Sequence, residues 1–144
     1  MIRRLASLLL LATLVTAPAF AEIGRIKRVY GQAQVKRGAT AMPAASGLPL
    51  LEHDILETGP DGRISIAFID NTRFSVGPKS RISVAQFKFD ETTHQGGRFT
   101  TQVDRGSLAI VSGQIAKEDK DAMRVRTPTS LLGVRGTRFV VDVK

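Results

Sequence analysis

The chain has 144 residues, the length of one ordinary domain, and 42% of them are hydrophobic, so it can form a core. It has no cysteine, which excludes disulfides, thiolate zinc sites and cysteine nucleophiles. Its net charge of +8 is compatible with an anionic partner.

Residues 1–21 have the pattern of a cleaved secretory signal peptide. Arg3 and Arg4 precede an apolar run that extends to Val15, and the segment ends in the small-x-small sequence Ala19-Phe20-Ala21. The alternative is a membrane anchor, but a spanning helix needs about 20 apolar residues, and Pro18 interrupts this run. We therefore expect cleavage near Glu22, export to the periplasm, no transmembrane anchor in the mature chain, and a single domain over residues 22–144.

Apolar and polar side chains alternate with a period of two along most of residues 22–144. Such alternation buries one face of a β-strand, and no amphipathic helix is indicated. Segments 38–50, 90–98 and 117–122 are expected to be exposed loops or turns. The side chains predicted to point into the core are Ile64, Ile66, Phe68, Phe74, Val76, Ile82, Val84, Leu108, Ile110, Val125, Val134, Phe139 and Val141.

Many short strands separated by Gly, Pro and Asn predict an all-β fold. The sequence RISIA at 63–67 is echoed by RISVA at 81–85. The echo fits two arrangements equally well: successive rungs of a solenoid-like stack of short strands, or adjacent strands of a β-sandwich.

The last segment changes its alternation. Leu132 and Val134 are even-numbered, whereas Phe139 and Val141 are odd-numbered, and a regular strand cannot bury both sets on one face. We expect Gly136 to lie at a bulge or corner that shifts the inward face. Gly133 is expected to allow a close backbone approach or to mark a second corner.

Four arginines lie at positions opposite to the inward ones in this odd–even alternation, so they should point outward. Thr127-Pro128 should interrupt the hydrogen bonding between strands among them, because Pro has no backbone N–H to donate. One interpretation is an ordinary solvated surface; the other is a basic binding face. The arginines are Arg124, Arg126, Arg135 and Arg138.

No catalytic or metal-binding pattern emerges. His53 and His94 are the only histidines and have no ligand spacing around them, and no Gly-x-Ser-x-Gly sequence occurs. We expect no cofactor, no metal and no enzymatic activity.

Three segments resemble FecR-type domains over roughly residues 23–144. They are HDILETGPDGRISIAFIDNTRFSVGPKSRISV at 53–84, RGSLAIVSGQIAKED at 105–119 and TPTSLLGVRGTRFVV at 127–141. The resemblance assigns a structural motif to Thr127, Pro128, Gly133, Arg135, Gly136 and Thr137. It implies an all-β, solenoid-like domain in the bacterial periplasm. In the iron-uptake regulators of this family, such a domain follows an anti-sigma segment and a transmembrane helix and senses an outer-membrane transporter; here we expect a signal peptide in their place.

These observations predict a protein-interaction or sensory module of the cell envelope, with another envelope protein as its partner and no nucleic acid. One alternative is a module that binds anionic envelope ligands, polysaccharide or lipid head groups, through its exposed arginines. Another is a structural subunit of an envelope assembly.

Overall fold

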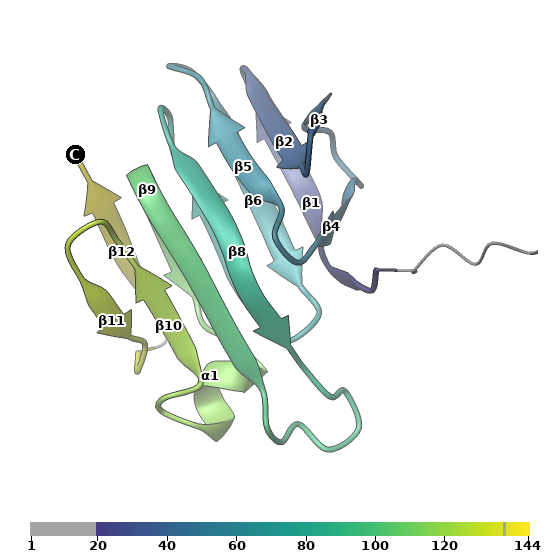
Figure 1. Cartoon of the computed structure of the whole chain (residues 1–144), viewed down its shortest axis with the longest axis vertical. Helices are drawn as coiled ribbons and strands as arrows, with labels where there is room; N and C mark the ends of the chain where they lie inside the picture. Colours follow the sequence, from purple (N-terminus) through teal and green to yellow (C-terminus); the bar gives the residue numbers. More distant parts are fainter. Residues whose placement is uncertain (1–19, 137) are drawn as a thin grey trace, which may run out of the picture.

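The computed structural model describes residues 20–136 and 138–144. The expected signal peptide therefore lies outside the described residues, except for Phe20 and Ala21, as does Thr137. Within the described residues there are twelve strands and one short helix (Figure 1). The elements are β1 (Glu22–Tyr30), β2 (Ala33–Arg37), β3 (Thr40–Pro43), β4 (Pro49–Leu51), β5 (Ile55–Thr58), β6 (Arg63–Phe68), β7 (Arg73–Val76), β8 (Arg81–Lys88), β9 (Arg98–Val111), α1 (Gln114–Glu118), β10 (Met123–Arg126), β11 (Leu131–Gly133) and β12 (Arg138–Val143).

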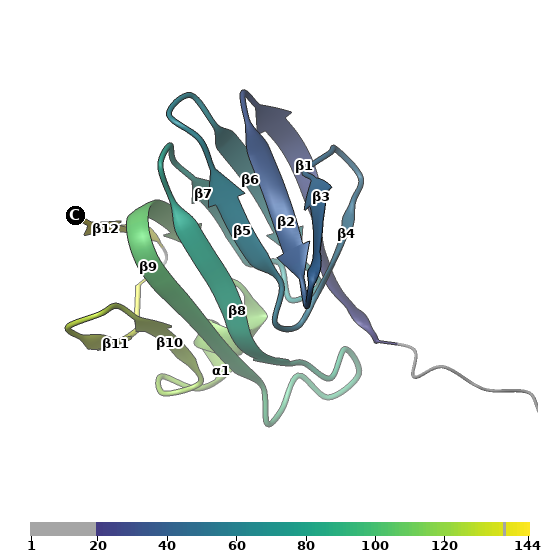
Figure 2. The ribbon, with the colours of Figure 1, turned by 45° about the horizontal axis from the view of Figure 1, so that its top comes forward.

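The predicted all-β class is confirmed. The strands form one sheet that curls into a half-barrel, so that two layers face each other (Figures 1 and 2). Layer A contains β4, β1, β6, β7, the second half of β9, and β12. Layer B contains β3, β2, β5, β8, the first half of β9, β10 and β11. Neighbouring strands are antiparallel except β9 and β10, and α1 lies in the crossover that this parallel pair requires.

The two echoed segments lie in opposite layers. RISIA belongs to β6 in layer A and RISVA to β8 in layer B, so they are neither paired rungs nor adjacent strands. Each alternates buried and outward side chains, and both bury their isoleucines in the same core. The echo therefore reflects a shared pattern of burial.

Strand β9 belongs to both layers and changes layer at Gly106. Up to Arg105 it pairs with β8, and from Gly106 onward it pairs with β12. Gly106 has a φ of +87°, a conformation that glycine adopts more readily than any other residue. A Cβ at this position would lie 2.5 Å from the Cα of Ser80, so the close approach also requires glycine.

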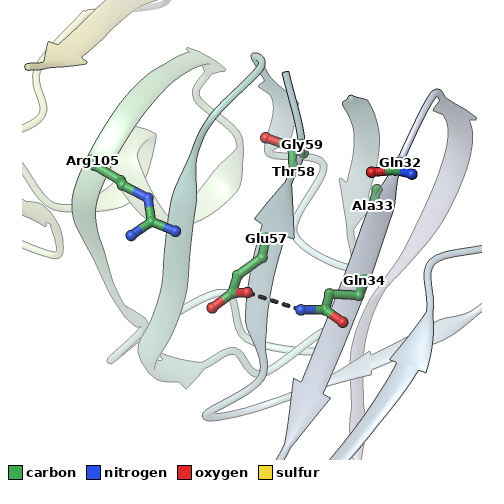
Figure 3. Close-up of a pocket in the computed structure, with 7 residues that line it drawn as sticks. All are labelled: Gln32, Ala33, Gln34, Glu57, Thr58, Gly59 and Arg105. Carbon is green, nitrogen blue, oxygen red and sulfur yellow. Dashed lines mark hydrogen bonds between the residues drawn. The ribbon is translucent and has the colours of Figure 1, made fainter. Parts of the chain in front are cut away.

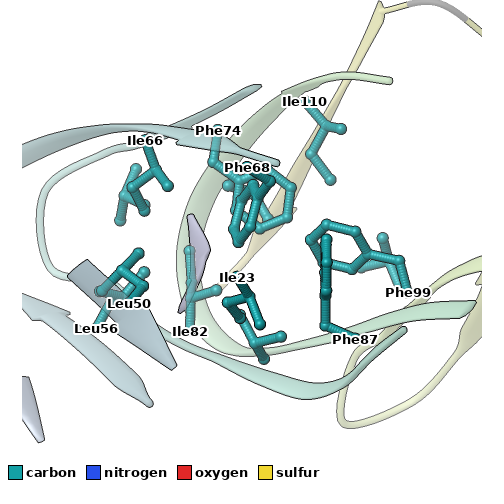
Figure 4. Close-up of a cluster of buried hydrophobic side chains, with 14 of the residues drawn as sticks. Ile23, Leu50, Leu56, Ile66, Phe68, Phe74, Ile82, Phe87, Phe99 and Ile110 are labelled. Carbon is teal, nitrogen blue, oxygen red and sulfur yellow. The ribbon is translucent and has the colours of Figure 1, made fainter. Parts of the chain in front are cut away.

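The core lies between the two layers (Figure 4). The predicted inward side chains are buried, except Phe139, which is partly buried and packs against the core. Four phenylalanine rings connect the layers, and the fully buried Phe99 contacts the other three. Its ring centroid lies 4.8 Å from that of Phe68, 5.5 Å from Phe74 and 4.9 Å from Phe87.

One local prediction was wrong. Segment 38–50, expected to be a loop, contains β3 and the start of β4, and its Leu50 is buried. The exposed charged turn expected at 117–122 is present at residues 120–121, but Lys117 and Glu118 form the end of the short helix α1, which the sequence did not indicate. The exposed loop expected at 90–98 is present over 90–97, and β9 begins at Arg98.

Candidate functional site

The C-terminal motif that begins at Thr127 starts as a hairpin turn. Thr127 and Pro128 connect β10 to β11, and the Thr127 backbone N–H donates to the Ser130 carbonyl at 2.8 Å. The Ser130 N–H in turn donates to the Thr127 hydroxyl at 3.0 Å. Gly133 ends β11, and a Cβ there would meet no atom within 4 Å, so close approach is not its role.

The chain then crosses from layer B to layer A. Val134 is buried, and its N–H donates to the Met123 carbonyl at 3.0 Å. The Gly136 carbonyl accepts a hydrogen bond from the Ser112 hydroxyl at 2.6 Å. Inward side chains are even-numbered before the crossing, as at Val134, and odd-numbered after it, as at Val141.

The expected change of phase is therefore present, but it arises from a change of layer between β11 and β12. Gly136 does not have a left-handed φ, and a Cβ on it would lie 3.9 Å from the nearest contacting atom, the Arg138 carbonyl oxygen. The structure provides no strained bulge at Gly136. The left-handed corner of this fold is instead Gly106.

The four arginines are all exposed, but they do not share one face. Arg124 and Arg126 lie on the outer side of layer B, opposite the buried Met123 and Val125. Arg138 lies on the outer side of layer A. Arg135 lies in the crossing between the two layers.

An opening separates β11 from β12 at one side of the half-barrel. It encloses about 480 Å³. Within the described residues, β11 pairs only with β10 and β12 only with β9, so each presents a free edge there. The exposed fraction is 42% for Leu132 and 70% for Val140. The lining residues of this β11–β12 opening are Thr127, Pro128, Thr129, Ser130, Leu132, Val140, Val141, Asp142, Val143 and Lys144.

The opposite side of the half-barrel is closed. The segment between β3 and β4 joins the two layers, because the Ala44 N–H donates to the Ala33 carbonyl in layer B at 3.0 Å and the Gly47 N–H donates to the Ile26 carbonyl in layer A at 2.8 Å. The Leu48 side chain also packs against the core. The half-barrel therefore has one bridged side and one open side.

A polar hollow of about 380 Å³ lies on the outer side of layer B (Figure 3). At its edge the Glu57 carboxylate accepts a hydrogen bond from Gln34 at 2.9 Å and forms ion pairs with Lys36 at 3.1 Å and with Arg81. The hollow is lined by Gln32, Ala33, Gln34, Glu57, Thr58, Gly59 and Arg105.

Glu57 is held in its ionised form. Burial alone would raise the pKa of Glu57, but hydrogen bonds from Gln34 and Lys36, together with the charges of Lys36 and Arg81, hold that pKa below its ordinary value. A carboxylate that is paired in this way holds β2, β5 and β8 together. It offers no proton for general acid catalysis at neutral pH.

The histidines remain without a site. His53 is exposed, and the ring of His94 stacks on Phe89 with centroids 5.4 Å apart. In residues 20–136 and 138–144, no three His, Asp or Glu side chains gather closely enough to hold a metal ion.

No helix in the described part of the chain is sufficiently long and apolar to cross a membrane.

Comparison with known proteins identifies one family. No curated protein and no solved structure is significantly similar to the chain. A family model described as FecR protein matches residues 54–144, which is more than half of the sequence and includes every strand from β5 to β12 as well as the β11–β12 opening. The chain belongs to the FecR family.

Proposed function

We propose that the chain is an exported, non-enzymatic module of the cell envelope that binds another envelope protein at the β11–β12 opening. Membership in the FecR family supports a signalling or sensory role in the envelope. Residues 1–21 support export, since they have a positively charged start, an apolar run and a small-x-small end.

The open side of the half-barrel is the observation that carries this proposal. A free strand edge presents unpaired N–H and C=O groups and can accept a further strand. Of the two free edges at this opening, β12 is the longer, with six residues against three in β11. The binding site is thus the β12 edge with an opening beside it that is lined by both polar and apolar residues.

The expected partner contributes an extended segment. It would pair with β12 and place alternate apolar side chains beside Leu132 and Val141, whose side chains line the opening. Burial of apolar area at Leu132 then adds to the backbone hydrogen bonds. A signal would be conveyed by occupancy of this edge.

Site-specific photo-crosslinking in the native host tests the proposal. A photoreactive residue is placed at Ser130, in the opening, and as a matched control at Ala41, which is exposed on the edge strand β3 of the closed side. We expect one defined adduct with another envelope protein from position 130 and none from position 41. The Leu132→Asp substitution should remove that adduct while the protein remains folded, because Leu132 is 42% exposed.

Equal adducts from both positions would contradict the proposal. Adducts with a second copy of this chain alone would instead support a structural subunit of an envelope assembly.

A further inference from the structure

The outer side chains of layer A form rows across its strands. The strand register aligns Arg28 with Ser65, Ser65 with Ser75, Ser75 with Ala109, and Ala109 with Val140. The centre of this row consists of two serines and an alanine, so its floor is low. The row crosses five strands, which at about 4.8 Å per strand gives it a length of about 19 Å.

Longer side chains stand on both sides of that floor. Arg73 belongs to the row on one side, where it is aligned with Ala67, and Arg63 belongs to the row on the other side, where it is aligned with Tyr30. The resulting space consists of two hollows of about 540 and 340 Å³ that share Ser65 and Ser75. We call these two adjoining hollows together the layer A trough.

Within residues 20–136 and 138–144, the cations around the trough have no acidic partner. Among the described residues, no carboxylate forms an ion pair with Lys27, Arg28, Arg63 or Arg73, and no Asp or Glu lines either hollow. Asp142 lies on the same outer side, but at the β12 end, aligned with Ser107.

The outer side of layer B provides the contrast. There Lys36 and Arg81 both pair with Glu57, and Arg81 also pairs with Asp104 at 3.2 Å. Both layers are therefore rich in cations, but layer B neutralises those at its centre and layer A leaves those around the trough unpaired. A concentration of unpaired positive charge raises the local concentration of anions.

We propose that the layer A trough binds a linear acidic polysaccharide that carries carboxylate groups. Its carboxylates would contact Arg63 and Arg73 on the two flanks and Arg28 at the β1 end. The hydroxyls of Ser65 and Ser75 on the floor would exchange hydrogen bonds with the sugar hydroxyls. This site meets the β11–β12 opening only at Val140, which lines both, and the two proposals can fail independently.

The shape of the trough favours a slender chain over a flat surface. An anionic bilayer would contact the flanking arginines without reaching the serine floor between them. Tyr30, which is 58% exposed beside Arg63, offers an aromatic ring with a polar tip, and such a ring can pack against a sugar while its hydroxyl bonds. A folded protein partner would likewise be too broad to enter a floor that is one row wide.

Binding measurements with two matched double variants test the proposal. The purified chain is titrated with polygalacturonate, with dextran as the neutral control and with vesicles of phosphatidylglycerol as the membrane control. The variant Arg63→Ser/Arg73→Ser removes two charges from the trough. The variant Arg124→Ser/Arg126→Ser removes two exposed charges from layer B and so produces the same change in net charge.

We expect polygalacturonate to bind, dextran not to bind, and the affinity to fall as salt is raised. The trough variant should bind about tenfold more weakly, and the layer B variant should bind like the parent chain. Tyr30→Ser should also weaken binding without any change in charge. All substituted side chains are exposed, so thermal melting should confirm that each variant is folded.

Several results would overturn the proposal. Equal losses in the two double variants would mean that only net charge matters. Binding to the vesicles without binding to polygalacturonate would assign the face to a membrane, and an absence of binding to polygalacturonate would remove the ligand class altogether.

Discussion

Replacement of Gly106 by alanine should be far more damaging than replacement of another glycine that has nearly the same φ. Gly106 has a φ of +87° and Gly47 has a φ of +89°. A Cβ on Gly47 would meet nothing within 4 Å, whereas a Cβ on Gly106 would lie 2.0 Å from the Oγ of Ser80 and 2.5 Å from its Cα. Both substitutions place a side chain on a backbone with positive φ, but only Gly106→Ala also brings the new Cβ into steric clash with Ser80.

The expected magnitudes follow from that difference. Left-handed strain in a residue with a Cβ costs about 1–2 kcal/mol, so Gly47→Ala should lower the free energy of unfolding by about that amount. Gly106→Ala must also displace the backbone of Ser80, whose Oγ accepts from the Ser107 N–H at 3.0 Å and whose N–H donates to the buried Thr58 hydroxyl at 2.9 Å. With these contacts disturbed, the total loss should reach about 3–5 kcal/mol.

Urea denaturation followed by circular dichroism provides the assay, with the slope of each transition checked for two-state behaviour. If the free energies of unfolding of the two alanine variants differ by less than about 0.5 kcal/mol, Ser80 moves aside at little cost, and the close approach at Gly106 does not contribute to stability.

Three further outcomes are expected. N-terminal sequencing of protein isolated from the envelope should begin near Glu22, and an intact Met1 would contradict cleavage. Phe99→Ala should lower the free energy of unfolding by about 3–5 kcal/mol, because three other rings contact Phe99. Phe89 is only partly buried, so Phe89→Ala should lower it much less. Equal losses would show that the ring cluster does not dominate the stability of the core. In the folded chain the pKa of Glu57 lies below its ordinary value. Ionised Glu57 therefore stabilises the fold at pH values above the pKa that Glu57 has in the unfolded chain, about 4.3. This stabilisation is lost as the pH falls through the pKa that Glu57 has in the folded chain. The stability advantage of the parent chain over Glu57→Gln should therefore shrink on acidification below about pH 5, and a constant difference in urea denaturation down to pH 3 would refute this role.

Alternation predicted the core well where a strand lies wholly within one layer. In β6 each inward residue faces the core, so the period of two is complete from end to end. Strand β8 keeps the period over Ile82 and Val84, but its register shifts between Val84 and Gln86, and the next buried residue is the odd-numbered Phe87. Strand β9 shows the limit: Phe99 and Val103 are odd-numbered and buried, whereas Leu108 and Ile110 are even-numbered and buried. The parity argument that was applied to Gly136 holds here, and Gly106 is the glycine between the two sets.

Short edge strands could not be recognised from the same signal. Strand β3 leaves most of its residues exposed, so its sequence has little reason to alternate. Strand β4 has three residues, of which Leu50 is buried, which is too short for a period to be read. Their hydrogen-bond partners define them: β3 forms a hairpin with β2, in which Arg37 is aligned with Thr40, and β4 pairs with β1, which is distant in the sequence.

The candidate sites depend on register in the same way. Parity correctly indicated that Arg124 and Arg138 point outward, but which layer each belongs to depends on the crossing between β11 and β12. Arg63 and Arg73 stand on two flanks of one depression only because Ser65 pairs with Ser75. The spacing of Arg63 and Arg73 along the sequence does not predict that they flank the same depression.

Strand β9 also constrains the order of folding. During synthesis from the N-terminus, β1–β8 emerge first, as groups of antiparallel strands from both layers, and the strand that joins β7 to β8 is still missing. Closure of the half-barrel must await residues 98–111, and the ring of Phe99, which completes the aromatic cluster, arrives with them. Topologies dominated by such distant pairings fold slowly, on a scale of about milliseconds to seconds. The half-barrel of such a nascent chain therefore stays open until most of its length has been made.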